Sequence, residues 1–183
     1  MPDDHELMMA VRDGDLDRLG PLFEKHNRHL YNFFFRQTRD PHTSEDLVQD
    51  VFHKILRYRH TYRGESKFTT WMFSIAHNSK IDYYRKNKHQ GDQIELSESL
   101  VSSDPTPEDT SLQKDEKALL MKALRMLSEE KREVLLLSRF QNMKYEEIAK
   151  ILGCKVGTIK ARVHWALKDL TNAYHKLAGS DAS

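Results

Sequence analysis

The strongest local signal in the sequence is YEEIAKILGCKVGTIKARV, residues 145–163. Apolar residues recur at helical spacing on both sides of Gly153, and glycine allows the left-handed backbone that reverses the chain between two helices. Ala149 places a small side chain where the two helices must come close. The stretch therefore predicts a helix-turn-helix whose inner angle is filled by Ile148, Leu152, Val156, Ile159 and Val163.

The second helix of this motif is predicted to expose basic and small polar side chains on one face. Such side chains contact phosphates and base edges in the major groove of duplex DNA. A helical hairpin with a solvated basic face is the simpler alternative, but it does not explain why the turn glycine, the small residue and the basic helix occur together. The residues predicted to contact DNA are Lys155, Thr158, Lys160, Ala161, Arg162, His164, Trp165 and Lys168.

Helical periodicity extends over nearly the whole chain, and β-branched alternation is absent, so we predict an all-α fold. A chain of 183 residues with 38% hydrophobic residues suits two small helical domains with modest cores. We predict the first over residues 1–90 and the second, with the helix-turn-helix, over residues 114–178, followed by a tail at 179–183. Four helices are expected in the second domain, the last over residues 156–170.

The two domains are predicted to be joined by a flexible acidic linker, residues 91–113. From Gly91 to Glu116 there are eight acidic residues and one basic residue, and serine, threonine and proline fill much of the rest. A simple solubilising tether is the plain alternative. The formal net charge of +1 is then an average over two basic domains and an acidic linker.

Four helices are also expected in the first domain, the first ending near Gly14 and the last running over residues 68–86. The third is expected to begin at residues 43–46, where Thr43 and Ser44 would supply the cap and Glu45 and Asp46 the acidic first turn. The predicted apolar sides are Leu7, Met8 and Val11 in the first helix, Leu22, Phe23, Leu30, Phe33 and Phe34 in the second, and Leu47, Val48, Val51, Phe52, Ile55 and Leu56 in the third.

Opposite the apolar stripe of the third helix lie four polar residues, Asp46, Gln49, Asp50 and His53. This face could dock on a basic partner helix, or it could simply be solvated. Paired acids also raise the question of a metal or of acid–base catalysis, but no histidine pair or Glu-x-x-His pattern accompanies them. We therefore predict no metal site, no cofactor and no catalytic residue.

Basic and aromatic residues alternate through residues 58–88. Basic side chains attract the phosphate backbone and aromatic side chains stack on unpaired bases, so this segment suits single-stranded or opening DNA. The alternative is that Phe68, Trp71, Met72 and Ile75 form the core of the domain, and we expect this to hold for most of them.

Other features of the sequence limit where the protein acts. Cys154 is the one cysteine, so no disulfide can form within the chain. The first seven residues are polar and acidic rather than those of a secretory signal, and no apolar run is long enough for a membrane span. We expect a soluble, cytoplasmic protein without stable membrane insertion.

The sequence resembles the extracytoplasmic-function class of RNA polymerase sigma factors, in the sigma-70 family. Its first domain is similar to theirs through EDLVQDVF (45–52), FTTWMFSIAHN (68–78) and IDYYRK (81–86). Its second is similar through LSEEKREV (127–134) and the helix-turn-helix. The resemblance implies a protein that directs core RNA polymerase to specific promoters, promotes DNA melting and has no catalytic activity of its own.

The resemblance also implies partners for each part of the chain. The third helix would dock on the clamp coiled coil of the largest polymerase subunit, through Asp46, Leu47, Gln49, Asp50, Phe52 and His53. The helix-turn-helix would read the -35 promoter element while the second domain sits on the flap of the other large subunit, and the linker would pass through the polymerase channels. The -10 element would be melted and read by Arg63, Ser66, Lys67, Phe68, Thr69, Trp71, Asn78, Lys80, Tyr84, Arg85 and Lys86.

Two residues depart from the family pattern, because members often have serine where this chain has Ala161 and arginine where it has Trp165. An anti-sigma factor is a further hypothesis taken from the family.

Two other classes of function compete with this interpretation. A conventional regulator that binds duplex DNA alone leaves residues 46–88 without a purpose, and an enzyme acting on nucleic acid would need a carboxylate cluster or a metal-bound water.

Overall fold

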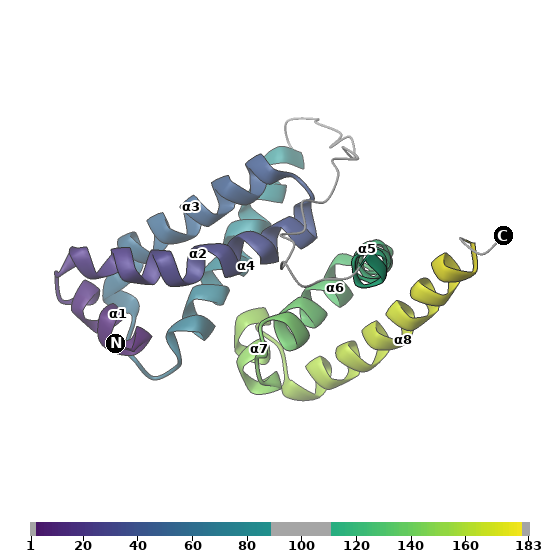
Figure 1. Cartoon of the computed structure of the whole chain (residues 1–183). Helices are drawn as coiled ribbons and strands as arrows, with labels where there is room; N and C mark the ends of the chain where they lie inside the picture. Colours follow the sequence, from purple (N-terminus) through teal and green to yellow (C-terminus); the bar gives the residue numbers. More distant parts are fainter. Residues whose placement is uncertain (1–2, 89–110, 181–183) are drawn as a thin grey trace. The chain divides into compact units, whose positions relative to one another are not determined.

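The computed structural model describes residues 3–88 and 111–180, and over these ranges it consists of helices with no strand (Figure 1). The predicted all-α fold is confirmed. The predicted linker, 91–113, lies outside the described residues except for its last three positions, which already belong to a helix. Among the described helices, none is long and apolar enough to cross a membrane.

Contacts divide the chain into two units, each described here by itself. The first contains α1–α4 together with residues 146–154, and the second contains α5, α6 and α8. Residues 146–154 form most of α7, so this division cuts through the predicted second domain at the helix-turn-helix.

Residues 3–88 of the first unit form four α-helices and two short 3-10 turns. In chain order they are α1 (Asp4–Arg12), η1 (Leu16–Arg18), α2 (Leu19–Thr38), α3 (Pro41–Tyr58), η2 (Arg59–Thr61) and α4 (Phe68–Lys88). The apolar stripes predicted for the first three helices form the core, with two exceptions. Leu56 is half-buried, and Phe23 is 40% exposed with its ring edge-on to buried Phe52, at a centroid distance of 4.8 Å.

The helix α3 begins earlier than the sequence predicted, and a different residue caps it. Asp40 is the N-cap, and its carboxylate accepts a hydrogen bond of 2.8 Å from the Thr43 backbone N–H. Pro41 occupies the first turn, where its missing N–H costs nothing. Thr43 and Ser44, expected as caps, are instead buried inside the first turn of α3.

Lys54 fixes α3 against α4. Its Nζ lies 2.9 Å from the Asp50 carboxylate on α3, and it donates to Ser79 Oγ at 3.0 Å and to Asp82 Oδ2 at 3.2 Å on α4. Burial alone would lower the pKa of Lys54, but the two carboxylates outweigh it and raise that pKa above the ordinary value. Lys54 therefore remains charged and holds the two helices in register.

The second unit contains α5 (Ser111–Arg125), α6 (Glu129–Leu135), the π-helical turn η3 (Leu136–Phe140) and α8 (Val156–Ser180). Arg132 of α6 supplies hydrogen-bond donors to backbone carbonyls at and just after the C-terminal end of α5. Its guanidinium donates to the backbone carbonyls of Leu124 (3.1 Å), Arg125 (3.0 Å) and Leu127 (2.9 Å). The helix α8 continues to Ser180, well past the expected end near residue 170, so residues 179 and 180 are helical rather than part of a tail.

Candidate nucleic-acid interface

The turn predicted at Gly153 is present. The helix α7 spans Tyr145–Leu152, and Gly153 follows it in the left-handed region, with φ of 63°. The Cys154 N–H donates to the Ala149 carbonyl at 3.0 Å, which ends α7 before α8 begins at Val156. No neighbour restricts a side chain at position 153, so the requirement for glycine there comes from the backbone angle alone.

The helix α8 has a buried side and an exposed side. Ile159, Val163 and Ala166 are buried, which fixes the orientation of the helix. Of the eight residues predicted to contact duplex DNA, Arg162 is half-buried and the other seven are exposed, so none belongs to the core. The exposed ones are Lys155, Thr158, Lys160, Ala161, His164, Trp165 and Lys168.

Neighbouring side chains hold two residues on this exposed side. The indole of Trp165 is 51% exposed, with Lys168 Nζ 5.2 Å from its ring centroid and the His164 ring centroid at 5.4 Å. Arg162 lies 3.7 Å from the Glu130 carboxylate at the start of α6. The face therefore presents an aromatic surface together with cations, two kinds of group that DNA-binding proteins use.

The polar face of α3 is exposed as predicted, but two residues of that predicted site are not on it. Asp46, Gln49 and His53 are exposed, and Asp50 is half-buried beside Lys54. Leu47 and Phe52 are buried in the core of the first unit. Their side chains position α3 and do not form its outer surface.

The residues predicted to contact melted DNA fall into three groups by their exposure. Exposed side chains come from the loop before α4 and from α4 itself: Arg63, Lys67, Asn78, Arg85 and Lys86. Half-buried ones are Ser66, Thr69, Trp71 and Tyr84. Phe68 and Lys80 are buried, which corrects their assignment to the DNA surface.

Lys80 shows why a basic residue in a basic segment need not lie on the surface. It is 1% exposed, and its Nζ donates to the Gln37 side-chain oxygen of α2 at 2.8 Å. The pairing offsets the cost of burying the ammonium group. Trp71, in contrast, packs against Tyr62 at a ring-centroid distance of 5.2 Å and keeps part of its surface accessible.

Sequence reasoning missed the residues that shape the loop before α4. Tyr62 is buried at the start of that loop, and His5 of α1 contacts it from 57 positions away in the sequence. No spacing rule links residues so far apart, so no signal in the sequence alone could have paired them. In the part of the chain that the structure describes, no group of three or more His, Cys, Asp or Glu residues could hold a metal ion.

Two family models match the chain: Sigma-70 region 2 over residues 22–90, and Sigma-70, region 4 over residues 117–170. The second match includes α7 together with most of α5 and α8, so both helices of the helix-turn-helix lie within one matched region. The chain is 33% identical over 156 residues to the RNA polymerase sigma factor YlaC of Bacillus subtilis, covering 84% of this chain and 90% of the relative. It is 29% identical over 154 residues to the ECF RNA polymerase sigma factor SigX of the same organism, covering 81% of this chain and 79% of the relative.

Solved structures show the same fold. The sigma factor RpoE from Bartonella quintana, in complex with the anti-sigma factor NepR, matches with a TM-score of 0.70 and 28% identity, covering 84% of this chain and 94% of that one. CnrH, in complex with the cytosolic domain of CnrY, matches with a TM-score of 0.68 and 24% identity, covering 92% of this chain and 95% of that one.

Proposed function

The chain belongs to the sigma-70 family as a sigma factor of the extracytoplasmic-function type, and we propose that its exposed faces divide between core RNA polymerase and the two promoter elements. The observation that supports this division is the placement of three separate sets of solvent-facing residues on α3, on the segment around α4 and on α8. Each set lies inside one of the two matched regions. The protein acts as an initiation factor and needs no catalytic group of its own.

The polar face of α3 is proposed to bind core polymerase. Asp46, Gln49, Asp50 and His53 form an acidic and polar ridge, while Leu47 and Phe52 anchor the helix from its buried side. An acidic ridge favours a basic partner helix, which fits the clamp coiled coil of the largest subunit. Because that polymerase works in the cytoplasm, we propose the same location for this protein.

The loop before α4 and the exposed side of α4 are proposed to open and read the -10 element. Arg63, Lys67, Arg85 and Lys86 supply positive charge for the phosphates. Trp71 and Tyr84 offer partly accessible rings on which an unpaired base can stack. Phe68 and Lys80 support this surface from inside.

The exposed side of α8 is proposed to read the -35 element as duplex DNA, with the domain at 114–178 placed on the flap of the second large subunit. Recognition helices contact base edges chiefly through their N-terminal residues. Thr158, Ala161 and Arg162 are therefore the proposed base contacts, and Lys155 and Lys160 the phosphate contacts. The acidic segment at 91–113 is proposed to thread the polymerase channels between the two domains.

An anti-sigma factor is a proposed additional partner. The structure of RpoE, which has the same fold, is a complex with the anti-sigma factor NepR. A conventional regulator that binds duplex DNA alone is not favoured, since region 2 covers residues 22–90 and such a regulator has no use for it.

Charge reversal on α3 tests the polymerase contact. Asp50→Arg places a cation against a basic partner, so we expect affinity for core polymerase to fall by at least about a hundredfold. Because Asp50 also pairs with Lys54, Asp46→Arg repeats the reversal at an exposed position. Asp17→Arg, an exposed acid in η1, is the matched control. Binding is followed by fluorescence anisotropy of the labelled chain, and wild-type affinity in both α3 variants would disprove the docking face.

A further inference from the structure

The loop from Tyr62 to Lys67, called the recognition loop here, joins η2 to α4. It carries three residues proposed for the -10 element, Arg63, Ser66 and Lys67. A loop that reads bases must hold its side chains in place before DNA arrives, because ordering them during binding costs free energy. The contacts that fix this loop therefore bear on promoter recognition.

Two features within the loop restrict its shape. Gly64 is in the left-handed region, with φ of 73°. Tyr62 is 2% exposed, and its hydroxyl donates to the Ser66 backbone carbonyl at 3.4 Å, across the loop. Burial, with the nearby charges of Asp3 and Asp4, raises the pKa of Tyr62, so this hydroxyl keeps its proton.

His5 of α1 contacts both points. Its Nδ1 lies 3.2 Å from the Tyr62 hydroxyl oxygen, and the tautomer with a proton on Nδ1 can donate to this oxygen while the hydroxyl donates to Ser66. The ring also closes the space beside Gly64, because a Cβ added there would lie 2.4 Å from His5 Cε1. A chain of hydrogen bonds thus runs from α1 through Tyr62 to Ser66.

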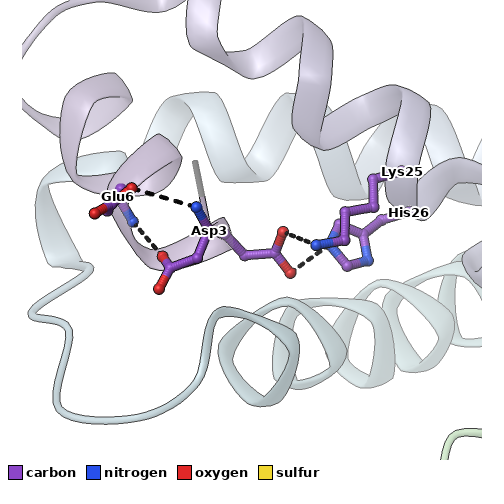
Figure 2. Close-up of polar contacts among 5 residues, drawn as sticks. Asp3, Glu6, Lys25 and His26 are labelled. Carbon is purple, nitrogen blue, oxygen red and sulfur yellow. Dashed lines mark hydrogen bonds and ion pairs between the residues drawn. The ribbon is translucent and has the colours of Figure 1, made fainter. Parts of the chain in front are cut away.

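The helix α1 is itself anchored on α2 by a side-chain contact, and Figure 2 shows Lys25 and His26 of α2 at this contact. The carboxylate of Asp4, the residue before His5, lies 2.7 Å from Lys25 Nζ and 2.9 Å from His26 Nε2. Asp3 and Glu6 form a capping box, in which the Glu6 N–H donates to Asp3 Oδ1 at 2.8 Å and the Asp3 N–H donates to Glu6 Oε2 at 3.3 Å. His5 therefore projects toward the loop from a fixed helix.

From this geometry we propose that His5 is a positioning residue for promoter recognition, and that α1 holds the recognition loop in the shape with which Arg63 and Lys67 meet the -10 element. The inference rests on the proposed function. It adds a role for α1, which precedes the region 2 match at residues 22–90. Because His5 is itself exposed, removing its ring opens no cavity in the core.

The test compares His5→Ala with His5→Asn and with His29→Ala, a control that removes another exposed histidine, on α2. The side-chain amide of asparagine can take the place of the imidazole Nδ1–H as a donor. Each full-length variant is assembled with core polymerase on a promoter library randomised in the -10 element. We measure which -10 sequences are selected and how strongly melted thymines react with permanganate. Both are measured on duplex templates and on templates already unpaired at the -10 element.

For His5→Ala we expect a broadened -10 base preference and opening of duplex promoters reduced on the order of fivefold, about the effect of losing one hydrogen bond. Polymerase affinity should be unchanged, opening should recover on unpaired templates, and His5→Asn should restore part of the preference. If His5→Ala had the same base preference as His29→Ala, the proposal would be overturned while the sigma function stayed intact. Wild-type chain that opens no promoter would overturn both.

A second measurement separates positioning from a general loss of order. Gly64→Ala introduces a methyl group against the His5 ring, so its effect on base preference should depend on His5. In the His5→Ala background the clash is absent, although the unfavourable φ of residue 64 remains. Gly64→Ala should therefore change the -10 base preference several-fold less in that background than in the wild type. Strictly additive effects of the two substitutions would contradict direct contact between His5 and the loop.

Discussion

The basic residues around α4 do not all lie on the surface of the first unit, because single partners elsewhere in the unit decide where each side chain lies. Basic residues in the segment 58–88 were predicted to face DNA, and Arg63, Lys67, Arg85 and Lys86 are exposed. Lys80 is buried because Gln37, 43 positions earlier, supplies an acceptor for it inside the unit. Periodicity identifies which face of a helix is apolar, but it cannot reveal a partner brought in by another helix.

His26 is a second buried polar residue, and it makes stability depend on pH. It is 6% exposed, between Asp4 and the ring of Phe68, whose centroid lies 5.3 Å away. Burial, reinforced by the charge of Lys25, lowers the pKa of His26 below 6.5, although Asp4 acts in the opposite direction. The neutral imidazole still donates its Nε2–H to Asp4.

The sign of the effect follows from this shift. Below pH 6.5 the unfolded chain binds a proton at this position that the folded chain does not, so the free energy of unfolding falls as pH decreases. The lowered pKa of Asp4, to which the hydrogen bond from Lys25 contributes, acts only in a more acidic range, below 3.8. We expect His26→Gln to flatten the pH dependence below pH 6.5, measured by urea unfolding, and His60→Gln, which replaces an exposed histidine in η2, to retain it. Equal slopes for all three proteins would contradict the assignment.

Arg162 gives a residue-scale prediction for the -35 element. If it contacts a base, Arg162→Ala should weaken promoter binding by about 1–3 kcal/mol, seen as a loss of upstream footprint protection. Glu130→Ala removes only its partner in an ion pair at the surface, which is worth little, so that variant should bind as the wild type does. Full protection with Arg162→Ala would remove this residue from the proposed site.

At the scale of elements, the sequence predicted the existence and type of the helices better than their ends. The apolar stripes of α1, α2 and α3 were recognisable because each repeats at helical spacing. The start of α3 lies before the predicted residues 43–46 because Asp40 followed by Pro41 forms a cap with the first helical residue. The end of α8 was placed too early, at residue 170, because apolar residues become sparser there, yet Ala173 is still buried and the helix continues to Ser180.

The junction of α5 and α6 shows how one side chain stabilises two elements. Arg132 donates to the backbone carbonyls of Leu124 and Arg125 at the C-terminal end of α5 and to that of Leu127 just after it. We expect Arg132→Ala to lower the free energy of unfolding by about 2–3 kcal/mol, since three partly buried carbonyls would lose a charged donor. Arg125→Ala, at the end of α5, is the matched control and should change stability by less than about 0.5 kcal/mol. Similar unfolding curves for both variants would show that Arg132 does not hold this junction.

At the scale of the whole molecule, the order of the two matched regions determines the function. A helix-turn-helix by itself fits many DNA-binding proteins, but here region 2 precedes region 4 and brings an acidic α3 face and a basic, aromatic α4 segment. Much of this division could be predicted from sequence patterns. The proposed contribution of α1 could not, because it depends on His5 contacting Tyr62 in the recognition loop and on Asp4 contacting Lys25 in α2.

Run-off transcription with core RNA polymerase, with and without this chain, on a pool of genomic fragments tests the central claim most directly. We predict discrete transcripts that depend on the added chain, with start sites whose alignment reveals a -10 and a -35 element. Addition of Asp46→Arg in place of the wild type should abolish them. No chain-dependent transcripts, together with tight binding of duplex DNA by the chain alone, would contradict the account and identify a conventional regulator instead.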